Sequence, residues 1–216
     1  METTLNNNQQ ETFNFFIKGF GSWTNKHENE INNIIITASS LIKEMEANGD
    51  LNHEFIRNNL CNCQDNISLL YEIFEKIKPT NEQDIFNEPS NIYFMLIMYS
   101  HWCESLRFIF NEPILKHYSD KNYISLRYFK KYFSEKYKTN GEKLFKERLF
   151  PPLRNAIAHN NIKIDSLNKS IEFYDTEQHK IVTRTFIEVV DIHDKFTMVY
   201  FCIVKELSGL ILNQKH

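Results

Sequence analysis

The chain has 216 residues, a net charge of −3 and 42% hydrophobic residues, a composition typical of a soluble globular protein. Its length allows one sizeable core, and five glycines and five prolines are too few for a turn-rich β fold. Residues 1–11 are polar, without the regions of a signal peptide, and no apolar stretch is long enough to span a bilayer. We therefore expect a cytoplasmic protein that forms a single domain over residues 1–216.

The predicted elements, taken in chain order, are mostly helices. Residues 1–11 are expected to be disordered. After them, apolar residues recur with helical period, and Gly, Pro and Asn mark where the periodic stretches end. The sequence Thr139-Asn140-Gly141, for example, is expected to end a helix. These patterns predict helices at residues 28–47, 50–78, 92–110, 123–137 and 187–212.

A short β segment is expected before the last of these helices. Residues 162–164 and 171–173 alternate between apolar and polar side chains, a turn sequence lies between them, and residues 181–186 are β-branched. Together they predict a small antiparallel hairpin or three-stranded meander at residues 162–186. The expected fold is therefore an all-α bundle with a small β insertion before the C-terminal helix.

The stretch with the clearest chemistry is residues 151–161, which read P-P-L-R-N-A-I-A-H-N-N. The two prolines can only begin a helix, and Asn160 or Asn161 suits the left-handed position that ends one. Asn155 and His159 are four residues apart and so share a face of this helix, with Arg154 about 100° around from Asn155.

These residue types suit the cleavage of a phosphodiester. A histidine in the last turn of a helix lies at the negative end of the helix dipole and can act as an acid or a base near neutrality. The arginine provides a permanent planar cation that fits phosphate, and the amide can orient either of them. The alternative is structural, with the arginine as a helix cap and the histidine as a hydrogen-bonded core residue.

The string L-R-N-A-I-A-H resembles the signature of the HEPN superfamily (higher eukaryotes and prokaryotes nucleotide-binding). That signature is an Arg, a polar residue and, a few residues later, a His, on a late helix of an all-α domain. Arg154, Asn155 and His159 fill these three positions, and none of the other arginines has a His five positions further on. The signature helix, the short β segment and the closing helix also resemble bacterial abortive-infection-type HEPN proteins.

The resemblance implies a metal-independent endoribonuclease that acts as a toxin or phage-defence effector. It implies a homodimer in which the signature helices of two subunits meet, with attack of the ribose 2′-OH on the adjacent phosphorus. His159 would transfer protons, Arg154 would stabilise charge on the phosphate oxygens, and Asn155 would orient His159 or the phosphate. Two alternatives are a non-catalytic HEPN module that binds nucleotide, RNA or a partner, and a toxin that an antitoxin or another defence protein silences.

The charge is distributed unevenly along the chain. Residues 126–169 hold 11 Lys and Arg against 4 acidic residues, a net charge of +7, so the remainder carries −10. Aromatic residues are interleaved with these cations, a pattern that suits an RNA backbone with bases able to stack, although a solvated helix face would look similar. The candidate RNA-binding residues are Lys143, Lys146, Arg148 and Lys163.

The cysteines favour neither disulfides nor a metal site. Cys61 and Cys63, with His53 nearby, could be a fragment of a metal site, but their spacing matches no standard zinc pattern and a second cysteine pair is missing. Cys103 and Cys202 lie among large apolar residues, which is typical of small hydrophobic core residues. We therefore expect no metal and no cofactor.

Overall fold

The computed structural model describes residues 5–7, 9–14, 27–60, 72, 88–146, 148–175 and 179–213. Its helices include α2 (Glu28–Ala47), α5 (Pro89–Ile109), α6 (Asn111–His117), α7 (Leu126–Lys136), α8 (Lys138–Phe145), α9 (Pro151–Ala158) and α10 (Phe186–Asn213). The strands are β1 (Ile162–Asp165), β2 (Ser170–Asp175) and β3 (Lys180–Thr185). The helical bundle with a β insertion before the C-terminal helix is therefore confirmed. Within the described ranges, no helix is both long enough and apolar enough to cross a membrane.

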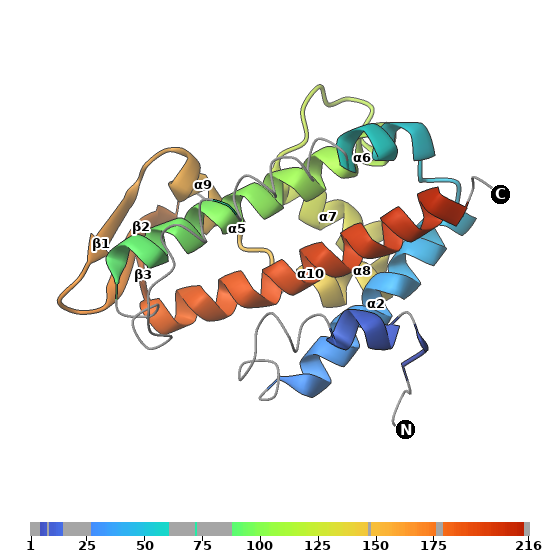
Figure 1. The fold of residues 1–216 in the computed structure, drawn as a ribbon. Coiled ribbons are helices and arrows are strands. Elements are labelled where there is room, and N and C mark those ends of the chain that lie inside the picture. The colour runs from blue at the N-terminus through green and yellow to red at the C-terminus, as the bar shows by residue number, and fades with distance from the viewer. Residues whose placement is uncertain are drawn as a thin grey trace.

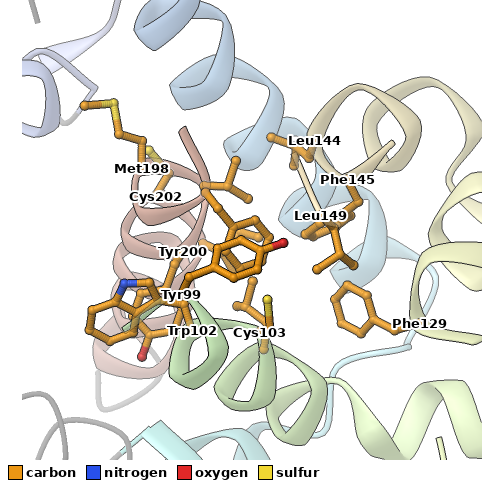
Figure 2. Packing of buried hydrophobic residues seen from close by; sticks show 14 of the residues in the cluster. Tyr99, Trp102, Cys103, Phe129, Leu144, Phe145, Leu149, Met198, Tyr200 and Cys202 are labelled. Atoms are coloured by element: carbon orange, nitrogen blue, oxygen red, sulfur yellow. The ribbon is translucent and has the colours of Figure 1, made fainter. Parts of the chain in front are cut away.

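The bundle is organised around α5 and α10, which lie side by side over most of their length, with α2 packed against α10 (Figure 1). Rings fill the space between these helices. Trp102 of α5 stacks on Tyr200 of α10 with ring centroids 4.5 Å apart, and Tyr99 meets Phe196 edge to face at 5.3 Å. Figure 2 shows this part of the core continuing past Cys103 and Leu149 toward Phe129 of α7. Aromatic rings therefore form part of the contact between α5 and α10.

Two cysteines are part of this core. Cys103 and Cys202 are buried and free, and burial raises the pKa of both thiols. A thiol that is held neutral and away from solvent behaves as a small hydrophobic side chain. The prediction for these two residues is therefore confirmed.

The β segment is a three-stranded antiparallel meander with the order β1-β2-β3. Ile171, Phe173 and Val182 are buried on its inner face, and Phe173 is paired with Val182 across β2 and β3. This face packs against α9, while the N-terminus of α10 follows directly from β3 (Figure 1). The predicted meander is confirmed, and its position supports the helix that carries the signature.

The expectation that Thr139-Asn140-Gly141 ends a helix is wrong, because these three residues lie inside α8. Gly141 is buried against α7, and a Cβ atom there would collide with the backbone of Phe133. The glycine therefore permits a close approach between two helices instead of ending one.

Among residues 1–11, which we expected to be disordered, residues 7 and 9–11 are helical, and the helical conformation continues to Asn14. Residues 5 and 6 lie outside the helix. The backbone N–H of Gln9 donates to Oδ1 of Asn6 at 3.0 Å, and the backbone N–H of Asn6 donates to Oε1 of Gln9 at 3.0 Å. Such a reciprocal capping box fixes the start of a helix. Most of the predicted helix at 50–78 lies outside the described residues, apart from a helical stretch at 53–60.

Candidate functional site

The signature lies on α9, a short helix whose two ends are both well defined. Pro151 and Pro152 occupy its first two positions, and Phe150 before them has a non-helical backbone with φ −116° and ψ 83°. The backbone N–H of Phe150 donates to the hydroxyl of Tyr99 at 2.7 Å, which ties the start of α9 to α5.

The other end of α9 is closed by a left-handed residue, as the sequence predicted. Asn160 has φ 52°, and its N–H donates to the carbonyl of Ile157 at 3.1 Å. The N–H of Asn161 donates to the carbonyl of Ala156 at 2.8 Å. These two bonds form a Schellman motif with His159 as the last residue before the left-handed turn.

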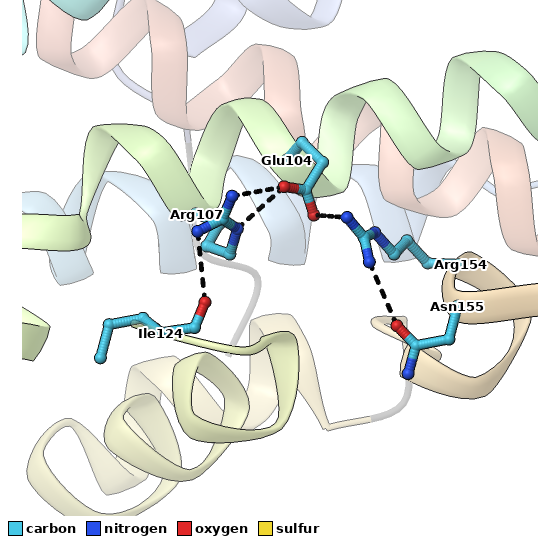
Figure 3. Close-up of polar contacts among 5 residues, drawn as sticks. All are labelled: Glu104, Arg107, Ile124, Arg154 and Asn155. Atoms are coloured by element: carbon cyan, nitrogen blue, oxygen red, sulfur yellow. Dashed lines mark hydrogen bonds and ion pairs between the residues drawn. The ribbon is translucent and has the colours of Figure 1, made fainter. Parts of the chain in front are cut away.

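Arg154 is held in place by contacts on two sides (Figure 3). Its Nη2 atom lies 2.5 Å from Oε1 of Glu104 on α5, and its Nη1 atom donates to Oδ1 of Asn155 at 3.2 Å. Only 17% of the side chain is exposed. Because an ion pair this sheltered is screened less than a surface pair, the orientation of the guanidinium is defined by its protein contacts.

Glu104 joins Arg154 to a second arginine on its own helix. Its Oε2 atom accepts hydrogen bonds from Nε and Nη2 of Arg107 at 2.9 and 2.6 Å. Arg107 in turn donates from Nη1 to the backbone carbonyl of Ile124 at 3.2 Å. The result is a row of Arg107, Glu104 and Arg154 that links α5 to α9 and carries a net charge of +1 (Figure 3).

Sequence reasoning did not identify Glu104 or Arg107. The available signal was an acidic and a basic residue three positions apart within a helix that is otherwise apolar nearly all round. Two charges in such a helix indicate a paired or functional role, because a buried charge without a partner is costly. The partner of Glu104 on α9, 50 residues later, is visible only in the fold.

His159 has a different environment from Arg154, although both lie on α9. Its side chain is exposed, and within the described residues it makes no hydrogen bond or ion pair. Asn155 is bonded to Arg154, and its contacts include none to the ring of His159. The structure therefore brings Arg154 and Asn155 together and leaves His159 accessible at the end of the same helix.

Three of the four predicted RNA-binding residues line one groove. Lys143, Lys146 and Arg148 line a groove of about 650 Å³ between α2 and α8, together with Asn33, Ile34, Thr37, Lys138, Thr139, Glu142 and Leu144. We refer to this surface as the basic groove. Lys146 is paired with Glu142 at 2.5 Å, and Arg148 contacts Glu30 of α2 at 3.0 Å. Lys163 lies instead on β1, 3.7 Å from Glu172, and is not part of this groove.

The described ranges contain no group of three or more His, Cys, Asp or Glu side chains that could hold a metal ion. Cys61 and Cys63 lie outside the described residues, while Nε2 of His53 lies 3.0 Å from Oε2 of Glu46. The chemistry that α9 itself offers is that of a fixed guanidinium, an amide and an accessible imidazole.

One comparison with known proteins, the comparison with protein families, gave a match. A family model described as HEPN pEK499 p136 matches residues 39–215, which include the signature, the meander and the long helices α5 and α10. The comparisons with curated proteins and with solved structures gave no match.

Proposed function

Since the chain belongs to the HEPN superfamily through the HEPN pEK499 p136 family, we propose that it is a metal-independent endoribonuclease. The observation that carries this proposal is the arrangement on α9. Arg154 is fixed beside Asn155 by two contacts, and the imidazole of His159 is exposed at the end of the same helix. A fixed cation and an accessible proton-transfer group are the two requirements for cleaving RNA without a metal.

In the proposed reaction the ribose 2′ oxygen attacks the adjacent phosphorus, and the bond from phosphorus to the 5′ oxygen breaks. The products are a 2′,3′-cyclic phosphate and a 5′-hydroxyl. One proton leaves the 2′-OH and one is delivered to the 5′ oxygen, and His159 serves as base or acid in these transfers. Arg154 stabilises the negative charge that develops on the non-bridging oxygens.

The proposed active form is a homodimer in which two copies of α9 contribute to one cleft. A dimer provides two histidines, one for each proton transfer. The support for this dimer is an apolar strip on the outer face of α5, formed by Tyr93, Ile97 and Phe108, whose side chains are 44%, 38% and 51% exposed. Glu104 lies on the same helical face, between Ile97 and Phe108, so the partner of Arg154 belongs to this face.

We further propose that cleavage of RNA makes the protein a toxin or phage-defence effector in the cytoplasm. An enzyme of this kind would stop translation when it is active, and an antitoxin or another defence protein would hold it inactive. The support is the family and the proposed chemistry together.

The test incubates total RNA with the wild-type protein, Arg154→Ala or His159→Ala in excess EDTA. The wild type should cut RNA and leave 2′,3′-cyclic phosphate ends. Loss of His159 should lower the rate by about 10²–10⁴, and loss of the Arg154 donors by about 10²–10³. Arg127→Ala is the matched control, because Arg127 is an exposed arginine on α7 that belongs neither to the signature nor to the row of Arg107, Glu104 and Arg154.

Two outcomes would contradict the proposal. Cleavage that stops when EDTA is added would assign the reaction to a metal ion. RNA binding without any cleavage, in all conditions and in cells that express the protein, would favour the non-catalytic binding module.

A further inference from the structure

Glu104 uses its two oxygens for two different arginines. Oε1 pairs with Arg154 at 2.5 Å, and Oε2 is bonded twice by Arg107 at 2.6 and 2.9 Å. The side chains of Arg107, Arg154 and Glu104 are 9%, 17% and 23% exposed, so the row is largely sheltered from solvent. Arg107 is itself fixed by the carbonyl of Ile124 and by the rings of Phe108 and Tyr123, 4.6 and 4.9 Å from its guanidinium.

This arrangement restrains the plane of the Arg154 guanidinium without using all of its donors. A guanidinium has five N–H groups; Nη1 of Arg154 donates one of them to Asn155, and Nη2 is ion-paired with Glu104. The Nη N–H groups that are left can donate to phosphate oxygens. A long side chain that is fixed in advance loses less conformational entropy when the transition state forms.

The second arginine explains why an acid can occupy this position. A carboxylate that paired with Arg154 alone would cancel the positive charge that a phosphate needs. Because Arg107 also binds Glu104, the row keeps a net charge of +1 and remains attractive to an anion.

We propose that Glu104 is a positioning residue that aims Arg154 at the scissile phosphate, with Arg107 holding Glu104 in place. This inference rests on the proposed ribonuclease function. A residue of α5, outside the signature, would then take part in the reaction, and the rate of turnover would depend on the charge of residue 104.

The proposal predicts that a change at Glu104 lowers the turnover of RNA without weakening RNA binding. Glu104→Gln has the same shape as the native residue and keeps a carbonyl oxygen that can accept from Arg154, but it removes one negative charge. RNA should therefore bind as well as before or more tightly, while kcat falls about 10- to 100-fold because the guanidinium is less firmly oriented. A loss of folding would instead lower the melting temperature and the amount of active protein.

The experiment is a double-mutant cycle in the full-length protein. It measures kcat and KM for RNA cleavage, and the melting temperature, for the wild type, Glu104→Gln, Arg154→Ala and the double variant. If Glu104 acts only through Arg154, the double variant should be no slower than Arg154→Ala. Glu112→Gln is the matched control, since Glu112 forms a similar pair with Lys116 at 2.9 Å on α6.

Wild-type kcat in Glu104→Gln, or additive losses in the double variant, would overturn the inference while the proposed function remained. Should Glu104→Gln fail to fold, Glu104→Asp takes its place, since it keeps the charge but is too short to hold both arginines. An inactive wild type would refute the proposed function instead. In that case the NMR signal of the Arg154 Nε–H tests whether Glu104 orients Arg154. The signal should shift in Glu104→Gln, and an unchanged signal would overturn the positioning role.

Discussion

The amide oxygen of Asn155 accepts a hydrogen bond from Nη1 of Arg154 at 3.2 Å, so the second residue of the signature faces the first (Figure 3). Either Arg154 or His159 was a possible partner for this amide from the spacing alone. The observed bond assigns Asn155 to the arginine. Together with Glu104, it holds the guanidinium from two sides.

Asn155→Ala should lower kcat about tenfold, because the guanidinium loses one of its two restraints. Asn155→Asp keeps an oxygen at the same position and should retain more activity than Asn155→Ala. The measurement is the pH profile of kcat for both variants. A weaker restraint on Arg154 lowers the whole profile, whereas an acidic or basic limb that moves in Asn155→Ala would show that Asn155 orients His159 instead.

Gly141→Ala should lower the free energy of unfolding by about 1–3 kcal/mol, the usual range for overpacking a close contact. The new Cβ would collide with the backbone of Phe133, which cannot move without shifting α7. Helix propensity alone predicts the opposite sign, since Ala is about 1 kcal/mol better than Gly within a helix. Urea unfolding tests this against Gly209→Ala on α10, where an added Cβ would meet no packing neighbour within 4 Å and a gain in stability is expected.

The case of Gly141 shows which parts of the fold could be predicted from the sequence. Periodicity gave the bounds of α2 and the positions of α5 and α10, because a long amphipathic or apolar helix repeats its signal many times. A single glycine carries no such repetition. Its role in α8 depends on Phe133 of the neighbouring helix, which no local pattern contains.

The candidate site shows the same limit. Local rules placed the prolines, Arg154 and the left-handed Asn160 correctly, since each depends on residues within α9. The ion pair with Glu104 joins residues that are 50 positions apart, and it follows from how α9 packs on α5. For the same reason the sequence grouped Lys163 with Lys143, although Lys163 lies on β1 and Lys143 lies on α8 in the basic groove.

The start of α10 should make stability depend on pH in the acidic range. The carboxylate of Glu188 accepts hydrogen bonds from the backbone N–H and Oγ1 of Thr185 at 2.7 and 3.0 Å. The backbone bond is the main reason why the pKa of Glu188 lies below its ordinary value of 4.5. Since the folded state has the lower pKa, this stabilisation is complete above the unfolded value and is lost as pH falls through the folded one.

Glu188→Gln should therefore be less stable than the wild type at pH 7, by less than about 1 kcal/mol because the carboxylate is largely exposed. The difference should shrink as pH falls below 4.5, where the carboxylate of the wild type becomes protonated. Urea unfolding of both proteins between pH 7 and pH 3 measures it. A difference that stays constant over this range would show that the charge of Glu188 does not contribute.

The basic groove predicts RNA binding that depends on salt. Lys143→Glu with Lys146→Glu should weaken binding to RNA of any sequence and flatten the salt slope, by about 0.7 for each phosphate that is no longer neutralised. Binding is measured by titration at several salt concentrations. Lys116→Glu on α6, outside the groove, should leave the slope unchanged.

Lys163→Glu tests whether bound RNA also contacts the β-sheet. Lys163 lies on β1 and is not part of the groove. If the salt slope of RNA binding is flatter in this variant as well, RNA contacts the sheet. A slope that none of these variants changes would show that RNA binds elsewhere on the protein.

The apolar strip on α5 predicts how a dimer can be broken without touching the signature. Ile97 lies at the middle of the strip, and a glutamate there would place a charge in the interface between two copies, which is costly to bury. Ile97→Glu should be a monomer by light scattering, with wild-type melting behaviour at high dilution and strongly reduced RNA cleavage. Ile187→Glu is the matched control, because Ile187 is even more exposed, at 75%, but lies in the first turn of α10. A dimer that persists in Ile97→Glu would exclude this face of α5 as the interface, and a fully active monomer would show that one copy of α9 suffices for cleavage.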